Sequence, residues 1–205
     1  KPQVFTPYNL EQENYTKLLW WFEGVTSYYD DLVLYRSGVI DREKYLGFIT
    51  DNLNNVYKFA GVTQQTLANS SLTSWIKYYR QDENSPNSIV SYYVKGSLVA
   101  LCLDLLIREQ SKFSLDDVMR YLFKQWQQNP AGIGEDEIPS LIKAATEVDL
   151  TEFIRLATET TEALPFKDLL AQFGLNLTER IAKNHQDGGK YKAQPDLATP
   201  AVTLD

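Results

Sequence analysis

The feature that most constrains this chain is a strongly apolar run with helical period that holds a single carboxylate. From Leu18 to Val25 that carboxylate, Glu23, is the exception among apolar and small residues. At 3.6 residues per turn, one continuous apolar stripe is formed by Leu18, Phe22, Val25, Tyr29 and Leu32. The pattern predicts a helix from about Tyr15 to Arg36, which Gly38 ends.

Glu23 lies on the flank of this stripe, in a row with Leu19, Thr26 and Asp30. A carboxylate in such surroundings is partly desolvated, which is costly unless a metal, a cation or hydrogen bonds compensate. Gly24 follows it in mid-helix, where glycine costs about 1 kcal/mol relative to alanine. A glycine in that position typically permits a close approach of backbone or ligand, so we expect something to be placed beside Glu23.

The rest of the chain also has helical patterns, and alternating strand patterns of any length are missing. Expected helices lie at about 42–60, 72–79, 90–108, 114–128, 139–146, 151–161 and 165–173, with loops at 62–71 and 80–88. Asp41 and a capping box at Ser114 start two of them, and the second of these should bury Leu115, Val118, Leu122 and Trp126. The fold class predicted is therefore all-α, with about seven or eight helices in one domain.

We expect this helical domain to cover residues 1–177. From about residue 178 the apolar period fades, and 178–205 has the composition of a polar tail or linker toward a following domain. The chain starts with Lys1-Pro2 rather than methionine, so we expect it to be a piece of a longer protein.

Charge and composition exclude several classes of function. With 20 basic and 27 acidic residues the net charge is −7, and no basic stripe is available to neutralise phosphates, so no nucleic-acid partner is expected. No apolar run reaches transmembrane length and no signal peptide is visible. We therefore expect a soluble chain without a membrane partner, and the compartment, cytoplasmic or periplasmic, is left open.

The usual nucleophile and base residues are scarce. The single cysteine, Cys102, lies in an apolar helical run and is expected to be a small buried hydrophobe. The single histidine, His185, lies in the polar tail, which is a poor setting for a catalytic base. Glu23 thus stands out as the candidate for chemistry, although its flank position also suits a salt bridge. Asp30 and Thr26 share its face of the helix and could hydrogen-bond another metal ligand.

Several sequence segments resemble those of the glycyl aminopeptidase family. Members of this family are zinc metallopeptidases of the gluzincin group with a thermolysin-like catalytic domain. The runs are LWWFEGVTSYY (19–29), WIKYYR (75–80), DENSPN (82–87), SYYVKG (91–96) and SLDDVM (114–119). The resemblance spans roughly residues 1–175. It implies that the chain is the helical C-terminal half of such a domain, which in this family is commonly followed by a PDZ-like module.

The resemblance implies roles for two residues. In the family, two histidines of an H-E-x-x-H helix and a downstream glutamate hold zinc, and Glu23 matches that glutamate. Tyr93 matches the tyrosine of a Tyr-x-Lys-Gly motif, which donates a hydrogen bond to the oxyanion of the reaction. Tyr92, directly before it, could take the same role, and a purely structural place in the core is the other reading of Tyr93.

The chain departs from the family in one large respect, because it contains no H-E-x-x-H. We therefore expect the piece alone to be inactive and to hold no stoichiometric zinc, although zinc is the cofactor expected of the parent. Its expected partners are a peptide substrate and the missing N-terminal catalytic lobe. Apolar surface left uncovered by that lobe could also make copies of the piece self-associate.

Two other classes of function stay open on the sequence. A helical-toroid glycosidase would suit carboxylates among aromatics, and it would need a second carboxylate near Glu23, for which Asp82 or Glu83 can be nominated. A non-catalytic helical interaction module would make Glu23 part of a structural ion pair.

Overall fold

The computed structural model describes residues 1–184, 187, 189–192 and 201–204. Within them the α-helices are α1 (Leu19–Arg36), α2 (Arg42–Tyr57), α3 (Gly61–Gln64), α4 (Leu67–Leu72), α5 (Ser85–Ser88), α6 (Val94–Gln110), α7 (Leu115–Gln128), α8 (Ile138–Thr146), α9 (Thr151–Glu159) and α10 (Phe166–Gln172). A 3₁₀ turn, η1 (Gln3–Phe5), and a π-helical segment, η2 (Ser74–Tyr78), complete the helical part. The predicted all-α class is confirmed.

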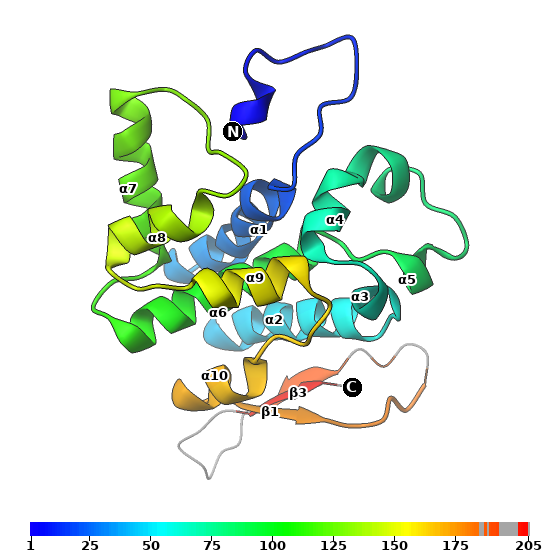
Figure 1. Ribbon diagram of the computed structural model, residues 1–205. Helices are drawn as coiled ribbons and strands as arrows, with labels where there is room; N and C mark the ends of the chain where they lie inside the picture. The colour runs from blue at the N-terminus through cyan, green and yellow to red at the C-terminus, as the bar shows by residue number, and fades with distance from the viewer. Residues whose placement is uncertain (185–186, 188, 193–200, 205) are drawn as a thin grey trace.

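The domain is built around two long helices, α1 and α6, which pack against each other through the middle of the molecule (Figure 1). Helix α2 lies along α6, while α7 and α8 pack together and α4 contacts α1 and α9. The core that these helices enclose is continuous and includes fully buried Leu53, Leu98, Val99, Leu103 and Ile107.

Helix ends follow the local chemistry read from the sequence. Asp41 accepts a hydrogen bond from the Lys44 backbone N–H at 2.8 Å and so caps α2. The Ser114 backbone N–H donates to the Asp117 carboxylate at 2.9 Å, as a capping box requires. Gly38, with φ of +75°, ends the first helix in the left-handed conformation that glycine adopts most readily.

Three short helices were not foreseen. Residues 62–71 and 80–88 were expected to be loops, and they contain most of α3, the start of α4 and all of α5. Each of these helices has six residues or fewer, too few for an apolar period to show. The first helix is also shorter than expected, since it begins at Leu19 rather than at Tyr15.

The buried faces of α1 and α7 differ from the predicted stripes. In α1 the residues that are buried are Trp20, Trp21, Gly24, Val25, Tyr28 and Leu32. Phe22 and Tyr29, expected in the stripe, are half-buried, because the tryptophans turn the contact face toward α6. In α7, Trp126 was expected to be buried and is instead 54% exposed, at the rim of a groove between α7 and α1.

The segment predicted as a linker contains three short strands. They are β1 (Asn176–Glu179), β2 (Lys190–Lys192) and β3 (Ala201–Leu204), with β3 in the middle, parallel to β1 and antiparallel to β2. The sheet lies against α2 and α10 at one edge of the domain (Figure 1). Strands of three or four residues have too little alternation to be read from sequence, and the division at residue 177 stays a prediction. His185 lies outside the described residues.

No helix in the part of the chain that the structure describes is long and apolar enough to span a membrane.

The contact between α1 and α6 depends on two glycines. A Cβ added to Gly24 would lie 2.5 Å from the Gly96 Cα, and one added to Gly96 would lie 2.7 Å from the Trp20 carbonyl oxygen. Both obstacles are backbone atoms, which cannot rotate away, so the two helices would have to separate. The predicted close approach beside Glu23 is thus an approach of helix backbones.

We expect Gly24→Ala to lower the free energy of unfolding by about 1–3 kcal/mol, the range for overpacking a tight core. Gly47→Ala in α2 is the matched control, because a Cβ there meets nothing within 4 Å. The control should be neutral or stabilising by up to about 1 kcal/mol, since alanine favours the helix. Chemical denaturation of the two variants measures both effects, and equal stability of the two would contradict the close-packing account.

Candidate active site

The crossing of α1 and α6 brings together two residues that lie 70 positions apart in the sequence. Glu23 precedes the contact glycine of α1, and Tyr93 lies one turn before the contact glycine of α6, at the N-terminal end of that helix. The negative charge of Glu23 acts on the Tyr93 phenol and is one of the causes that raise its pKa. Both side chains are half-buried, so both are partly accessible.

Glu23 lies between the face of α1 that packs on α6 and the exposed face that carries Thr26. At 100° of rotation about the helix axis per residue, the Glu23 side chain is about 100° from Gly24, which faces α6, and about 60° from Thr26 in the other direction. Glu23 itself is therefore on an outward flank of α1, where no described contact with a cation is formed. The salt bridge that the sequence left open for Glu23 is not present among the described ion pairs.

Tyr93 belongs to a cluster of four tyrosines at the start of α6. The Tyr79 hydroxyl lies 3.1 Å from the Tyr92 hydroxyl and 3.5 Å from that of Tyr93. The Tyr92 and Tyr93 rings have their centroids 4.6 Å apart, and Tyr78 packs on both. These ring contacts hold the Tyr93 phenol in one place, so its hydroxyl is positioned before any ligand arrives.

The electrostatic surroundings keep Tyr93 in its neutral, donating form. The pKa of Tyr93 is raised to about 12. Burial of the phenol is the largest cause, and the hydrogen bond with Tyr79 and the negative charge of Glu23 raise the pKa further. A phenol with that pKa donates a hydrogen bond throughout the neutral and mildly alkaline range. Tyr92 is 1% exposed, against the half-buried Tyr93, so Tyr93 is the better placed of the two to meet a ligand.

Two other predicted residues are not brought into contact with Glu23. Thr26 is exposed, and its hydroxyl donates to the Phe22 carbonyl of its own helix at 2.6 Å. Asp30 is exposed and lies two turns beyond Glu23. The pKa of the adjacent Asp31 is raised, mainly because Asp31 is partly buried and also because of the negative charge of Asp30. Both lie on the Glu23 side of α1, so their role in orienting a metal ligand stays a prediction.

Within the described parts of the chain no three histidine, cysteine or acidic side chains come together in a way that could hold a metal ion. A zinc site usually needs three protein ligands and an open position. Glu23 is a half-buried carboxylate without a salt-bridge partner in the described structure, so it fits the requirement for one ligand of a site completed from elsewhere.

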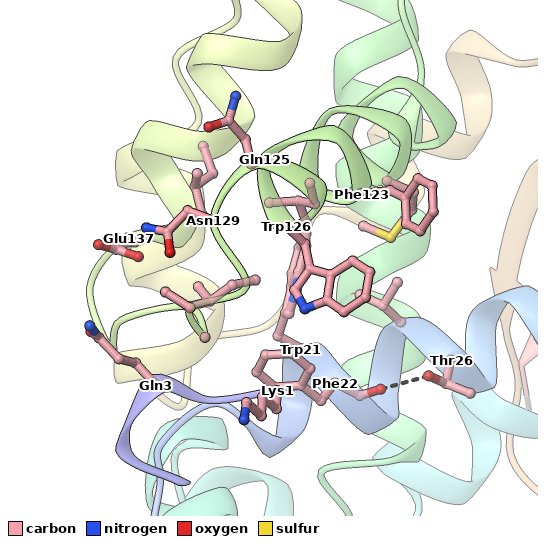
Figure 2. Close-up of a pocket in the computed structure, with 17 residues that line it drawn as sticks. Lys1, Gln3, Trp21, Phe22, Thr26, Phe123, Gln125, Trp126, Asn129 and Glu137 are labelled. Atoms are coloured by element: carbon pink, nitrogen blue, oxygen red, sulfur yellow. Dashed lines mark hydrogen bonds between the residues drawn. The ribbon is translucent and has the colours of Figure 1, made fainter. Parts of the chain in front are cut away.

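A groove of about 580 Å³ lies between α1 and α7 (Figure 2). Its α1 wall consists of Trp21, Phe22, Val25 and Thr26, and the facing wall is the outer half of α7. Neither Glu23 nor Tyr93 lines it. The groove and the tyrosine cluster are therefore separate features, since none of the four tyrosines lines the groove.

Lys95, between Tyr93 and Gly96, was not singled out from the sequence. Its side chain is fully buried, and its Nζ is the one buried side-chain nitrogen or oxygen without a hydrogen-bond partner in the described chain. Desolvation by burial lowers the pKa of Lys95 to about 8. The position of Lys95 in an apolar helix is the one sequence feature that could have predicted its burial. The sequence alone, however, does not show which side of a helix is buried.

The chain aligns with the crystal structure of an aminopeptidase N family protein from Idiomarina loihiensis at a TM-score of 0.85 and 38% sequence identity, over 98% of this chain and 37% of that one. The family model for M61 glycyl aminopeptidases matches residues 1–99, which include Glu23 and Tyr93. Together these two matches support the chain as a fragment of an M61 aminopeptidase-family protein. No curated protein matches the sequence significantly.

The chain spans little more than a third of the Idiomarina loihiensis chain, so the larger part of that chain has no counterpart here. Both matches are to aminopeptidases, and this similarity supports a peptidase-related function.

Proposed function

We propose that this chain is the helical part of a zinc-dependent aminopeptidase that removes glycyl-type residues from the N-termini of peptides. Glu23 would be one zinc ligand and Tyr93 the donor to the oxyanion. The observation that carries the proposal is the α1–α6 crossing at Gly24 and Gly96, which sets a half-buried carboxylate beside a held, neutral phenol.

The remaining parts of the site would come from an N-terminal catalytic lobe outside this chain. That lobe would supply two imidazole ligands and a general base, as the family resemblance implies. Zinc, when bound, would lower the pKa of a water molecule and polarise the peptide carbonyl. The present residues alone would hold no stoichiometric zinc and would be inactive, since they offer a single ligand.

Within this scheme, the two residues of the chain have separate tasks. The Glu23 carboxylate contributes negative charge and one oxygen ligand. The Tyr93 hydroxyl donates a hydrogen bond to the carbonyl oxygen as water attacks and negative charge develops there. Because the tyrosine cluster holds the phenol in place, little reorganisation is needed when that charge forms. The phenol stays protonated throughout, since its pKa of about 12 is far above working pH.

The other classes have weaker support. For a glycosidase, Asp82 is already engaged in local structure, because it accepts hydrogen bonds from the Asn84 backbone N–H and the Ser85 hydroxyl, each at 3.0 Å. The family match is to aminopeptidases. A non-catalytic module would require that the whole protein lacks the other ligands.

The test is hydrolysis by the whole protein. We expect it to release the first residue of a glycyl peptide, to leave the same peptide with an acetylated N-terminus uncleaved, and to lose activity on treatment with a zinc chelator. Adding zinc after the chelator is removed should restore the rate. Activity that survives complete chelation would rule out the metal, and failure to cleave any free N-terminus would favour the non-catalytic reading.

A further inference from the structure

The Tyr93 phenol is held by a second tyrosine, Tyr79, which comes from another element of the fold. Tyr79 directly follows the π-helical segment η2, whereas Tyr93 directly precedes α6. The Tyr79 side chain is 58% exposed, yet its hydroxyl lies 3.1 Å from the buried Tyr92 hydroxyl and 3.5 Å from the Tyr93 hydroxyl. Tyr79 is thus an exposed residue whose polar end is placed at the proposed oxyanion donor.

The π-helical turn brings two consecutive tyrosines to the start of α6. The Tyr79 backbone N–H donates to the Ser74 carbonyl at 3.0 Å, five residues back, which makes this turn wider than an α-helical one. The Tyr78 hydroxyl pairs with the Ser91 hydroxyl at 3.2 Å, while the Tyr79 hydroxyl reaches that of Tyr93. Turns of this kind are rare and are frequently found at functional sites.

A buried amide fixes the segments that carry the two phenols relative to each other. The Gln65 Oε1 accepts a hydrogen bond from the Val90 backbone N–H at 3.0 Å, and its Nε2 donates to the Thr73 hydroxyl at 3.1 Å. Val90 leads into the segment of Tyr93, and Thr73 directly precedes η2, which leads into Tyr79. Gln65 is 4% exposed, so water does not compete for these bonds. The contact between the two hydroxyls is therefore built into the fold before any ligand arrives.

A phenol hydroxyl has one hydrogen to donate, and its oxygen can also accept one. In the free protein Tyr93 can give its hydrogen to the Tyr79 oxygen. An oxyanion is a stronger acceptor than a neutral phenol, so Tyr93 turns its hydrogen to the oxyanion as charge develops there. The Tyr79 hydroxyl can then donate its own hydrogen to the Tyr93 oxygen. Successive hydrogen bonds polarise one another, and this strengthens Tyr93 as a donor while both phenols stay neutral.

We propose that Tyr79 is a positioning residue for the aminopeptidase reaction, whose hydroxyl holds the Tyr93 hydroxyl at rest and donates to it when Tyr93 bonds the oxyanion. This inference rests on the proposed function, in which Tyr93 is the oxyanion donor. Tyr79 acts through Tyr93 alone and has no contact of its own with the reacting atoms. Removal of its hydroxyl should therefore matter only while the Tyr93 hydroxyl is present.

The experiment is a double-mutant cycle in the whole protein with Tyr79→Phe, Tyr93→Phe and both substitutions together, followed by steady-state kinetics on a glycyl peptide. We expect Tyr79→Phe to lower kcat by about 3–10-fold, the effect of one neutral hydrogen bond. KM should change little, because the bond strengthens only as charge develops. In the Tyr93→Phe background the same substitution should change kcat by less than about 2-fold, since the group it acts on is gone.

The control for the loss of a hydroxyl is Tyr35→Phe. Tyr35 is an exposed tyrosine at the other end of α1, where its ring stacks on Tyr45, outside the cluster. This variant should keep the kcat of the unmodified protein. An unchanged kcat in Tyr79→Phe would overturn the proposal. So would a double variant whose loss equals the product of the two single losses, because Tyr79 would then act independently of Tyr93, for example by disturbing the buried Tyr92.

A phosphinic analogue of a glycyl dipeptide supplies a readout that does not require turnover. Its anionic oxygen stands in for the oxyanion, so Tyr79→Phe should weaken inhibition by the same factor of about 3–10. An inhibitor that binds Tyr79→Phe as tightly as the unmodified protein would overturn the proposal, even if kcat had fallen.

Failure of the proposed function gives a different pattern. If Tyr93→Phe keeps full kcat, the oxyanion role of Tyr93 is wrong and the assignment of Tyr79 falls with it. If Tyr93→Phe loses kcat by about 10²–10³-fold while Tyr79→Phe loses nothing, the proposed function stands and the role of Tyr79 alone is wrong.

Discussion

Tyr93→Phe in the whole protein is expected to lower kcat for a glycyl peptide by about 10²–10³-fold, the cost of removing one donor to an oxyanion. The substitution removes the hydroxyl and keeps the ring, so the packing with Tyr78 and Tyr92 is preserved. KM should change little, because the hydrogen bond strengthens as charge develops on the carbonyl oxygen. Zinc content should be unaffected.

The matched control for this substitution is Tyr78→Phe. Tyr78 lies in the same cluster, but its hydroxyl pairs with the Ser91 hydroxyl at 3.2 Å. We expect kcat to stay close to that of the unmodified protein. The measurement is steady-state kinetics of both variants. If Tyr93→Phe retains full kcat, the oxyanion role of Tyr93 is wrong, and equal losses in both variants would indicate a packing effect.

Lys95→Met is expected to stabilise the protein, by about 3 kcal/mol at neutral pH. In the folded state burial lowers the pKa of Lys95 to about 8, whereas an unfolded lysine titrates near 10.4. Below pH 8 the folded chain therefore bears the full cost of keeping the buried group charged. Methionine has a similar length and removes that cost, and no partner is left behind, because Nζ has none in the described chain.

The pH dependence of this gain has a definite sign. The unfolded state binds more protons than the folded state between pH 8 and about 10.4, so the stability of the natural protein rises across that window. The advantage of Lys95→Met should be constant below pH 8, shrink above it and vanish near pH 10.4. Lys77→Met, at an exposed position, is the control and should stay within about 0.5 kcal/mol at every pH.

Urea unfolding from pH 6 to 10 measures both variants. A Lys95→Met protein that is less stable than the natural one at pH 7 would show that the ammonium has a favourable partner in solution. A gain that does not change with pH would show that packing, rather than charge, is responsible.

The features that could be predicted from the sequence were mostly those that depend on residues close together in the chain. The caps at Asp41 and Ser114 depend on a side chain three residues from the backbone group it meets, so both were predictable. The burial of Lys95 and the exposure of Trp126 depend on which neighbours pack on each helix face, and a helical period does not say that. The strands and the shortest helices had too few residues to show any period.

The candidate site was predicted in part. The carboxylate of Glu23 and its glycine neighbour stood out by themselves, but the partner across the crossing did not. Tyr93 was identified through the family motif, because nothing in the intervening 69 residues reveals that α6 meets α1 at Gly24. The tyrosine cluster that holds Tyr93 also joins η2 to α6, and only the fold shows that pairing.

The most direct test of the account is the zinc content of the whole protein with Glu23→Gln, measured by elemental analysis beside the unmodified protein and Glu43→Gln. Glu43 is an exposed glutamate in the first turn of α2, away from the crossing. We predict about one zinc per chain in the unmodified protein and in Glu43→Gln, and a large loss in Glu23→Gln, since a neutral amide is a poor zinc ligand. Full zinc retention in Glu23→Gln would contradict the central claim that Glu23 holds the metal.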